Sequence, residues 1–227
     1  MTTTNTQGEL IATAERLFAE QGIDGPSLRL LNRAAGQRNT SALRYHFGDR
    51  DNVLRAILAK HETDIEHGRN TLLDQVELQD VFTLRDLATA LVLPLANKLG
   101  DLEGGHYLQI IGEIVGRPTR FSAVLQDVLR TPSLTRWARV VEPLIPPAAV
   151  GAPLHRRFAA ARFVHSELAS RARERRTRDH RLFTSQLVDL IEGLLVAPVS
   201  PATERLILPH RPDSSSRSPH AFTLEVK

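Results

Sequence analysis

The sequence predicts an all-α protein, and three observations support this fold class. Apolar residues recur about every 3.6 positions, the spacing that places them on one face of a helix, from the N-terminus to about residue 198. Glycines and prolines separate these periodic blocks, and no block alternates apolar and polar residues as a strand would. With 227 residues, of which 41% are hydrophobic, the chain is long enough to bury a core.

The first two helices are predicted before residue 36. One apolar stripe ends near Gly22, at the turn GIDGP, and its members are Leu10, Ile11, Ala14, Leu17 and Phe18. Ser27 suits the N-cap of a short second helix, because its hydroxyl can accept a hydrogen bond from a backbone N–H of the first turn. That helix should end at Gly36 in the left-handed conformation that glycine adopts most easily.

Two further helices follow this glycine. Asn39 can cap a third short helix that extends through Tyr45, and Asp49 can cap a long fourth helix from 49 to about 75. The small core expected around the turn consists of Leu17, Phe18, Leu28, Leu31, Ala35, Leu43 and Phe47. Two short helices joined by a tight glycine turn and braced by an amphipathic helix predict a helix-turn-helix.

The periodic blocks beyond residue 80 predict a helical bundle. Blocks at 84–95, 107–115 and 121–128 come first, and Thr131 and Pro132 then open a helix in the preferred N-cap and N1 order. Two longer helices are expected at 154–174 and 181–196. After Pro198 the chain is rich in Pro, Ser and Arg, which predicts a mostly disordered tail over 199–227.

Positive charge is concentrated around the predicted turn. The net charge of the whole chain is only +3, but five arginines and one acid, Asp49, lie between Ser27 and Arg50. Arginines can donate to guanine edges or phosphates, hydroxyls can donate to phosphates, and a small side chain allows close approach to a base. These properties favour a DNA-binding surface, although an arginine-rich face is often only solvated.

Three segments, FAEQGI, SLRLLNRAAG and YHFGDRDNVLRAIL, resemble the N-terminal DNA-binding region of TetR-family transcriptional regulators. The resemblance covers roughly residues 8 to 60, and the rest of the chain resembles the family's ligand-binding and dimerisation domain by architecture alone. It implies a DNA-binding domain at 1–50 and a ligand-binding and dimerisation domain at 51–198. It also implies a repressor that binds a palindromic operator on double-stranded DNA. This repressor is expected to be a homodimer that pairs through 154–174 and 181–196. An unknown small-molecule effector is expected to release it from the DNA.

The resemblance also assigns DNA contacts. The residues that it places at or near base edges are Thr40, Ser41, Ala42 and Arg44. Those that it places near phosphates are Ser27, Tyr45, His46 and Arg50, and Arg38 and Asn39 complete the predicted surface. Two departures bear on DNA preference: the turn before the YHF segment is one residue longer than usual, and Arg44 stands where the family usually has a tyrosine.

Catalytic, metal and cofactor motifs are not found in the sequence. There is no cysteine, GxSxG, HExxH or P-loop, and no GxGxxG after a strand. HETDIEH at 61–67 combines histidines and acids, but positions six apart do not share a helix face, so we expect an exposed polar surface. EGGHY at 103–107 is interpreted as an interhelical turn. A helical enzyme or a non-DNA interaction module remains the alternative function.

Candidates for an effector cavity are the residues Tyr107, Ile111, Phe121, Trp137 and His165. Pockets in helical bundles combine apolar walls with a few polar groups, but these residues could equally be ordinary core. A second basic run at 171–181 is expected to be a solvated loop between the last two helices. Because the chain has neither a basic-then-apolar N-terminal signal nor an apolar run of about 18 residues, we expect a cytoplasmic protein without a membrane partner.

Overall fold

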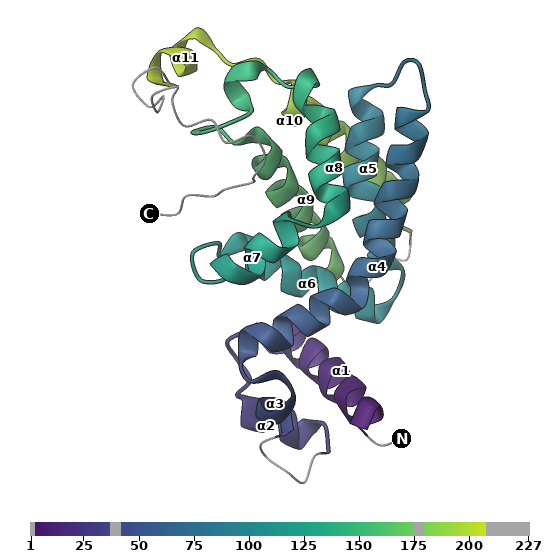
Figure 1. The fold of residues 1–227 in the computed structure, drawn as a ribbon, viewed down its shortest axis with the longest axis vertical. Helices are drawn as coiled ribbons and strands as arrows, with labels where there is room; N and C mark the ends of the chain where they lie inside the picture. Colours follow the sequence, from purple (N-terminus) through teal and green to yellow (C-terminus); the bar gives the residue numbers. More distant parts are fainter. Residues whose placement is uncertain (1–2, 37–41, 175–178, 208–227) are drawn as a thin grey trace.

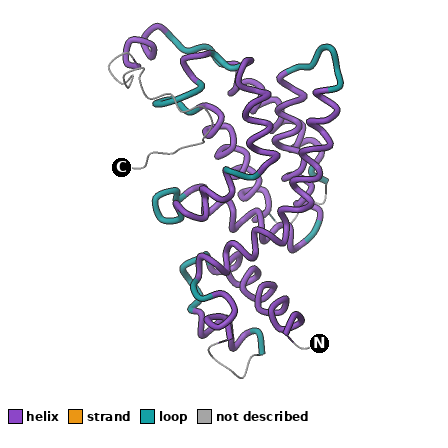
Figure 2. Tube along the Cα trace, viewed as in Figure 1, coloured by secondary structure: helices purple, strands orange, loops and turns teal. Residues whose placement is uncertain are grey.

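The computed structural model describes residues 3–36, 42–174 and 179–207, with the side chains of 3–5 left out. The described chain is 80% helical and contains no strand (Figure 2), which confirms the predicted all-α class. Figure 1 shows a small N-terminal group of helices below a larger bundle, and one long helix that extends from the first into the second.

The small group contains α1 (Thr3–Gln21), α2 (Leu28–Ala34) and α3 (Ala42–Phe47). The predicted small core is confirmed at its centre, because Leu17, Phe18, Leu31 and Leu43 are all buried. The other three expected members, Leu28, Ala35 and Phe47, are only partly buried and pack against its edge.

Local hydrogen bonds fix the ends of α2. The hydroxyl of Ser27 accepts a hydrogen bond from the backbone N–H of Leu30 at 3.1 Å, as the predicted N-cap should. Gly36 has a φ of +68°, the left-handed conformation expected after α2. Asn32, which the sequence did not single out, is buried and accepts from the Leu43 N–H at 2.9 Å. This bond connects α2 to α3. The cap predicted at Asn39 lies outside the described residues.

The long helix α4 (Arg50–Glu77) joins the small group to the bundle. Its N-cap is Asp49, as predicted, and the carboxylate accepts from the Asn52 N–H at 2.8 Å. α4 packs against α1 and α3 and also against α5 and α8. Its residues therefore contribute to both parts, and the domain boundary predicted at residue 50 stays a prediction.

The bundle consists of α5 (Leu84–Ala96), α6 (Leu102–Gly116), α7 (Ser122–Leu129), α8 (Pro132–Val141), α9 (Arg156–Arg173) and α10 (Arg181–Val196). Short 3₁₀ helices lie at η1 (Asn97–Gly100), η2 (Glu142–Leu144) and η3 (Pro147–Ala149). α6 packs closely on α9, and a Cβ on Gly112 would overlap that of Ala169. Only glycine permits this approach of the two helices.

Three local predictions in the bundle need correction. EGGHY is part of α6 rather than a turn, because Asp101 caps the helix through the N–H of Gly104 at 2.7 Å. Thr131 precedes Pro132 at the start of α8, but its side chain makes no capping bond. Residues 201–207 form α11 (Pro201–Ile207) within the segment predicted to be a disordered tail, and 208–227 lie outside the described residues.

Candidate nucleic-acid interface and interior cavity

The outer face of α3 carries exposed polar and aromatic side chains at the end of the small group that lies away from the bundle (Figure 1). Arg44 and Tyr45 are exposed, Tyr45 to 83%, and His46 is partly exposed. The rings of Tyr45 and His46 meet edge to face with their centroids 5.1 Å apart. Within the described chain Arg44 has no ion-pair partner, so its guanidinium is free to bind an external acceptor.

Several predicted contact residues precede this helix. Arg38, Asn39, Thr40 and Ser41 lie outside the described residues, and their roles stay predictions. Ala42 is only 7% exposed and belongs to the core together with Leu43. The prediction that Ala42 lies at a base edge therefore needs correction, because its methyl group faces the interior. Ser27 is exposed, and its hydroxyl proton remains free to donate while the oxygen caps α2.

Arg50 has a structural role in the described chain, and its predicted phosphate contact stays a prediction. Its guanidinium donates to the carbonyl oxygens of Ile23 and Pro26, the latter at 2.8 Å. It also lies over the ring of Phe18, 5.7 Å from the centroid, where the cation and the π-face attract each other. These contacts hold the connection between α1 and α2 against the core.

Buried ionic groups connect α1 to α4 at the junction with the bundle. Glu15 of α1 is 1% exposed, and its carboxylate lies 2.6 Å from the Nε2 of His61 and 2.9 Å from the Nζ of Lys60. Burial alone would raise the pKa of Glu15, but hydrogen bonds from His61 and Lys60 outweigh it and lower the pKa. His61 is therefore buried, which corrects the expectation that HETDIEH forms an exposed surface throughout.

A second connection runs from α6 to the segment between α1 and α2. The carboxylate of Glu113 accepts a hydrogen bond from the backbone N–H of Ile23 at 3.0 Å. Arg117 and Arg120 form ion pairs with Asp24 at 2.8 and 3.3 Å. The hydrogen bond from Arg117 holds the pKa of Asp24 below its usual value. The bundle thus contacts the residues that immediately precede the helix-turn-helix.

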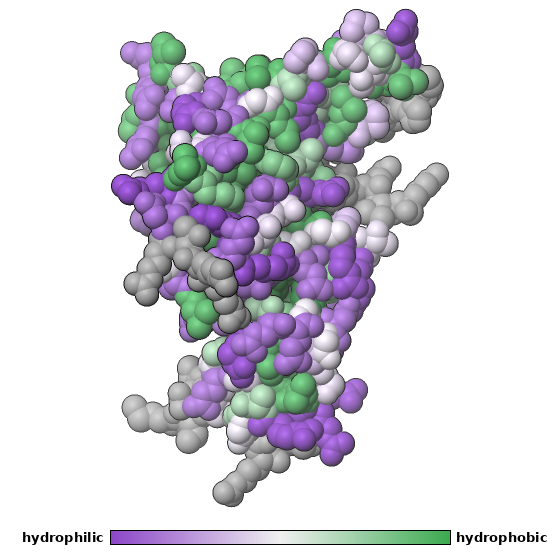
Figure 3. Space-filling model, turned by 180° about the vertical axis from the view of Figure 1, so that it is seen from behind, coloured by the Kyte–Doolittle hydropathy of each residue, from purple (hydrophilic) through white to green (hydrophobic). Residues whose placement is uncertain are grey.

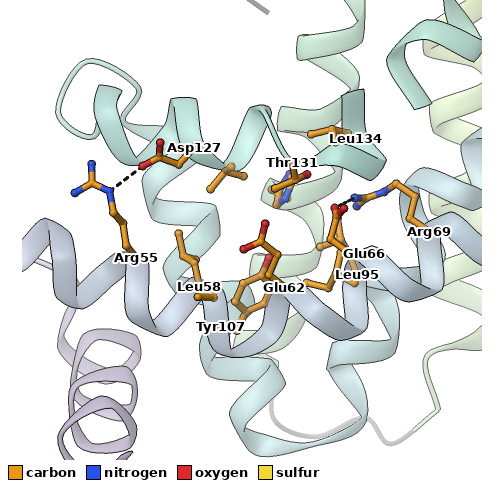
Figure 4. Close-up of a pocket in the computed structure, with 14 residues that line it drawn as sticks. Arg55, Leu58, Glu62, Glu66, Arg69, Leu95, Tyr107, Asp127, Thr131 and Leu134 are labelled. Carbon is orange, nitrogen blue, oxygen red and sulfur yellow. Dashed lines mark hydrogen bonds and ion pairs between the residues drawn. The ribbon is translucent and has the colours of Figure 1, made fainter. Parts of the chain in front are cut away.

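A cavity of about 270 Å³ lies between α4, α5, α6, α7, α8 and α9 (Figure 4). Its apolar walls come from Leu58, Ala59, Ile65, Leu95, Val128 and Leu134. Its polar lining consists of Arg55, Glu62, Glu66, Arg69, Tyr107, Asp127, Thr131 and His165. A cavity that combines apolar walls with convergent polar side chains is typical of small-molecule sites.

Two of the five predicted effector residues, Tyr107 and His165, line this cavity. Ile111, Phe121 and Trp137 do not, and all three are fully buried core residues. The indole N–H of Trp137 donates to the carbonyl of Leu87 at 2.8 Å, so its polar atom is satisfied within the protein. For these three residues the alternative of ordinary core is the correct one.

Most charged groups of the cavity have partners inside the protein. Arg55 donates to Asp127 at 2.8 Å, and Glu66 accepts from the N–H and hydroxyl of Ser133 at 2.8 and 2.5 Å. Arg69 donates to the same hydroxyl at 2.8 Å. Glu62 has no hydrogen bond or ion pair with any residue that the structure describes. Burial and the nearby charges of Glu66 and Asp127 raise its pKa.

His165 of α9 is a further lining residue of the cavity. Its side chain is 5% exposed, and Nδ1 lies 2.7 Å from the carbonyl oxygen of Ala161. Burial lowers its pKa to about 4. The imidazole is therefore uncharged near neutral pH, and its Nδ1–H donates to the helix backbone.

This chain is similar to a known repressor over part of its sequence and to a solved structure over most of its fold. No family model matches the chain. The HTH-type transcriptional repressor AcnR of Corynebacterium glutamicum is 39% identical over 54 residues, which are 24% of this chain and 28% of AcnR. The chain thus matches less than a third of the length of this curated relative.

The crystal structure of NalD, the secondary repressor of the MexAB-OprM multidrug efflux pump in Pseudomonas aeruginosa, is similar over nearly the whole chain. The TM-score is 0.54 with 18% identity, over 87% of this chain and 100% of NalD. NalD is a TetR-family regulator. The chain has the TetR-family fold. At this level of identity, the likeness establishes the fold alone.

Most of the cavity of this TetR-family fold was missed by the sequence interpretation. Seven lining residues lie on α4 at helical spacing: Arg55, Leu58, Ala59, Glu62, Ile65, Glu66 and Arg69. Residues three and four apart share a helix face, so this mixed polar and apolar stripe was a signal that could have been used. The sequence interpretation of HETDIEH as an exposed polar surface, with a metal site as the alternative, did not include a cavity.

The described residues contain neither a metal-ligand cluster nor a single membrane-spanning helix. Among the residues described, no three His, Asp or Glu side chains are grouped as a metal site would require. In the same ranges no single helix is long and apolar enough to cross a membrane. α10 and α11 pass that test only as a pair, which is bent by 63°.

Proposed function

We propose that the chain is a DNA-binding transcriptional regulator, a repressor that binds a palindromic operator as a homodimer and is released by a small-molecule effector. The observation that carries the proposal is the exposed face of α3, with Arg44 free of internal partners. The 54-residue likeness to a helix-turn-helix repressor supports it, because that length is close to the span of the predicted DNA-binding region. A regulator of this kind acts in the cytoplasm.

The proposed interface places α3 in the major groove. Arg44 reads base edges, where an arginine can donate twice to guanine. Ser27, Tyr45 and His46 contact phosphates, and Arg38, Asn39, Thr40 and Ser41 contribute from the turn. Ala42 and Arg50 are left out, because one is buried and the other is engaged with the α1–α2 connection. Phosphate contacts make the affinity strongly dependent on salt.

The proposed dimer uses α9 and α10, the segments predicted at 154–174 and 181–196. Three large apolar residues of α10 are exposed, Leu182 to 83%, Leu190 to 46% and Val196 to 52%. Hydrophobic residues also gather on the rear face of the bundle in Figure 3, the side on which α10 lies. A contiguous apolar surface is typical of an interface, and two-fold pairing presents two recognition helices to a palindrome.

Effector release is proposed to act through the junction between the bundle and the small group. Tyr107 lines the cavity, and its ring lies 4.8 Å from that of His61, centroid to centroid. His61 in turn contacts Glu15 of α1. An effector that binds better when α4 and α1 are shifted would favour the state that does not fit DNA, which is a population shift.

The test of this function is a gel-shift titration with duplex DNA from the region upstream of the gene. Arg44→Ala should weaken sequence-specific binding by roughly 5- to 150-fold, or about 1–3 kcal/mol, and leave thermal unfolding unchanged. Arg130→Ala is the matched control, because Arg130 is an exposed arginine of the bundle. Wild-type affinity in Arg44→Ala would remove Arg44 from the interface. A helical enzyme or a non-DNA interaction module would give no specific shift.

A further inference from the structure

We propose that the cavity binds a small apolar molecule carrying one positive charge, a protonated or quaternary amine, through the carboxylate of Glu62. This inference rests on the proposed function, since it names the chemical class of the effector.

The internal pairing of charges leaves Glu62 as a cavity carboxylate without a hydrogen-bond or ion-pair partner among the described residues. Arg55 is bound to Asp127, while Arg69 is held by Ser133 at 2.8 Å and lies 3.7 Å from Glu66. Figure 4 shows the Glu62 carboxylate directed from α4 into the space below α7 and α8, with no dashed contact. The side chain of Glu62 is exposed, so a ligand that enters the cavity can reach the carboxylate.

The surrounding charges favour a cation over an anion. The charges that act on Glu62 are those of Glu66 and Asp127, both acidic, and they raise the pKa of Glu62 further than burial alone. A bound cation would relieve this repulsion, and an anion would add to it. The buried Nε of Arg69 has no hydrogen-bond partner in the described chain, but it is sealed from solvent, so it offers an entering anion no accessible donor.

Tyr107 supplies a second, independent sign of a ligand. Its side chain is only 6% exposed and lines the cavity, yet its hydroxyl has no hydrogen-bond partner among the residues described. Burial raises its pKa, the charge of Arg69 opposes this rise, and the charge of Glu62 adds to it. The neutral hydroxyl can accept a hydrogen bond from an ammonium group, and the ring attracts cations over its face.

The remaining walls set the size and polarity of the rest of the ligand. Leu58, Ile65, Leu95, Val128 and Leu134 face the cavity from four helices. The volume of about 270 Å³ is just below the range of roughly 300–1,000 Å³ found for drug-sized ligands. The cavity therefore suits a compact apolar body with a single charged end.

The experiment is isothermal titration calorimetry of the full chain, without DNA, using three probes of similar size. The probes are 2-phenylethylamine, 2-phenylethanol and phenylacetate. Near neutral pH the first is positively charged, the second is uncharged and the third is negatively charged. The amine should bind about tenfold tighter than the alcohol, as a charged hydrogen bond implies, and phenylacetate should bind weakest. Glu62→Gln should abolish the preference for the amine and leave the affinity for the alcohol unchanged.

Asp80→Asn is the control, because Asp80 is an exposed acid outside the cavity. Three results would each overturn the proposal. The first is binding of phenylacetate or phenylethanol that is as tight as that of the amine, or tighter. The others are an unchanged amine affinity in Glu62→Gln and no amine binding at millimolar concentration. A gel shift keeps the two proposals separate. Specific DNA binding without amine binding would support the proposed regulator and contradict the cationic effector. Glu62-dependent amine binding without DNA binding would support the cationic ligand and contradict the proposed regulator.

Discussion

Arg44 and Arg50 carry the same charge and lie six positions apart, but the structure gives them different surroundings. Arg44 points away from the protein on α3, whereas Arg50 donates into the α1–α2 connection. The sequence interpretation treated both as DNA contacts, because a local excess of arginine does not show which guanidinium meets a backbone carbonyl. That distinction depends on how the GIDGP turn folds back onto α4, a contact between residues more than 20 positions apart.

His165 gives a prediction about acid stability. Its pKa is about 4 in the folded protein and its ordinary value is 6.5, so between these pH values the unfolded chain binds a proton that the folded chain does not. The contribution of His165 to folding is therefore complete above pH 6.5 and falls as the pH is lowered towards 4. In urea titrations, the free energy of unfolding of wild type should fall between pH 7 and pH 5 by about 2 kcal/mol more than that of His165→Gln. Equal losses would contradict the burial of His165.

Burial also separates the candidate cavity residues into those that line the cavity and those that lie in the core. Tyr107 and His165 line the cavity, whereas Trp137 is enclosed and satisfied by Leu87. The periodicity of the sequence places all of these residues on inner helix faces, but it does not show where the helices leave space between them. Helix packing leaves that space where side chains from six helices meet, and this cannot be derived from one helix at a time.

For the individual helices, local sequence signals predicted several helix ends correctly. Ser27, Gly36 and Asp49 have the roles predicted for them, because a cap depends on hydrogen bonds within three or four residues. The start of α6 was missed, since Gly104 and Gly105 suggested a turn. Position 104 in the first helical turn requires a glycine, because a Cβ there would overlap the backbone of Lys98.

The connection from α6 to the segment before α2 gives a prediction at this scale. Glu113→Ala removes the acceptor of the Ile23 N–H and a partner of Arg117. Hydrogen exchange of the Ile23 amide should become faster, because the bond that protects it is lost. Asp80→Ala, on an exposed position remote from this contact, should leave that exchange rate unchanged. Unaltered protection of Ile23 in Glu113→Ala would show that α6 does not hold the segment.

For the whole molecule, the class of fold was predictable and the relation between its parts was not. Apolar periodicity over some 200 residues is sufficient to indicate an all-α chain. The placement of Glu15 beside His61 and of Glu113 beside Ile23 depends on how α1 meets α4 and α6. These contacts support the proposed mechanism of effector release, because they connect the bundle that holds the cavity to the helices of the small N-terminal group.

The central claim, that the chain recognises a DNA sequence as a symmetric dimer, is tested most directly by selecting duplexes from a random-sequence pool with the purified protein. The account predicts enrichment of a palindrome whose half-sites lie about one helical turn or a multiple of it apart, the spacing that two recognition helices of a two-fold dimer require. Arg44→Ala should lose or alter the enriched bases under the same conditions. A pool that shows no enriched sequence after repeated rounds would contradict the account.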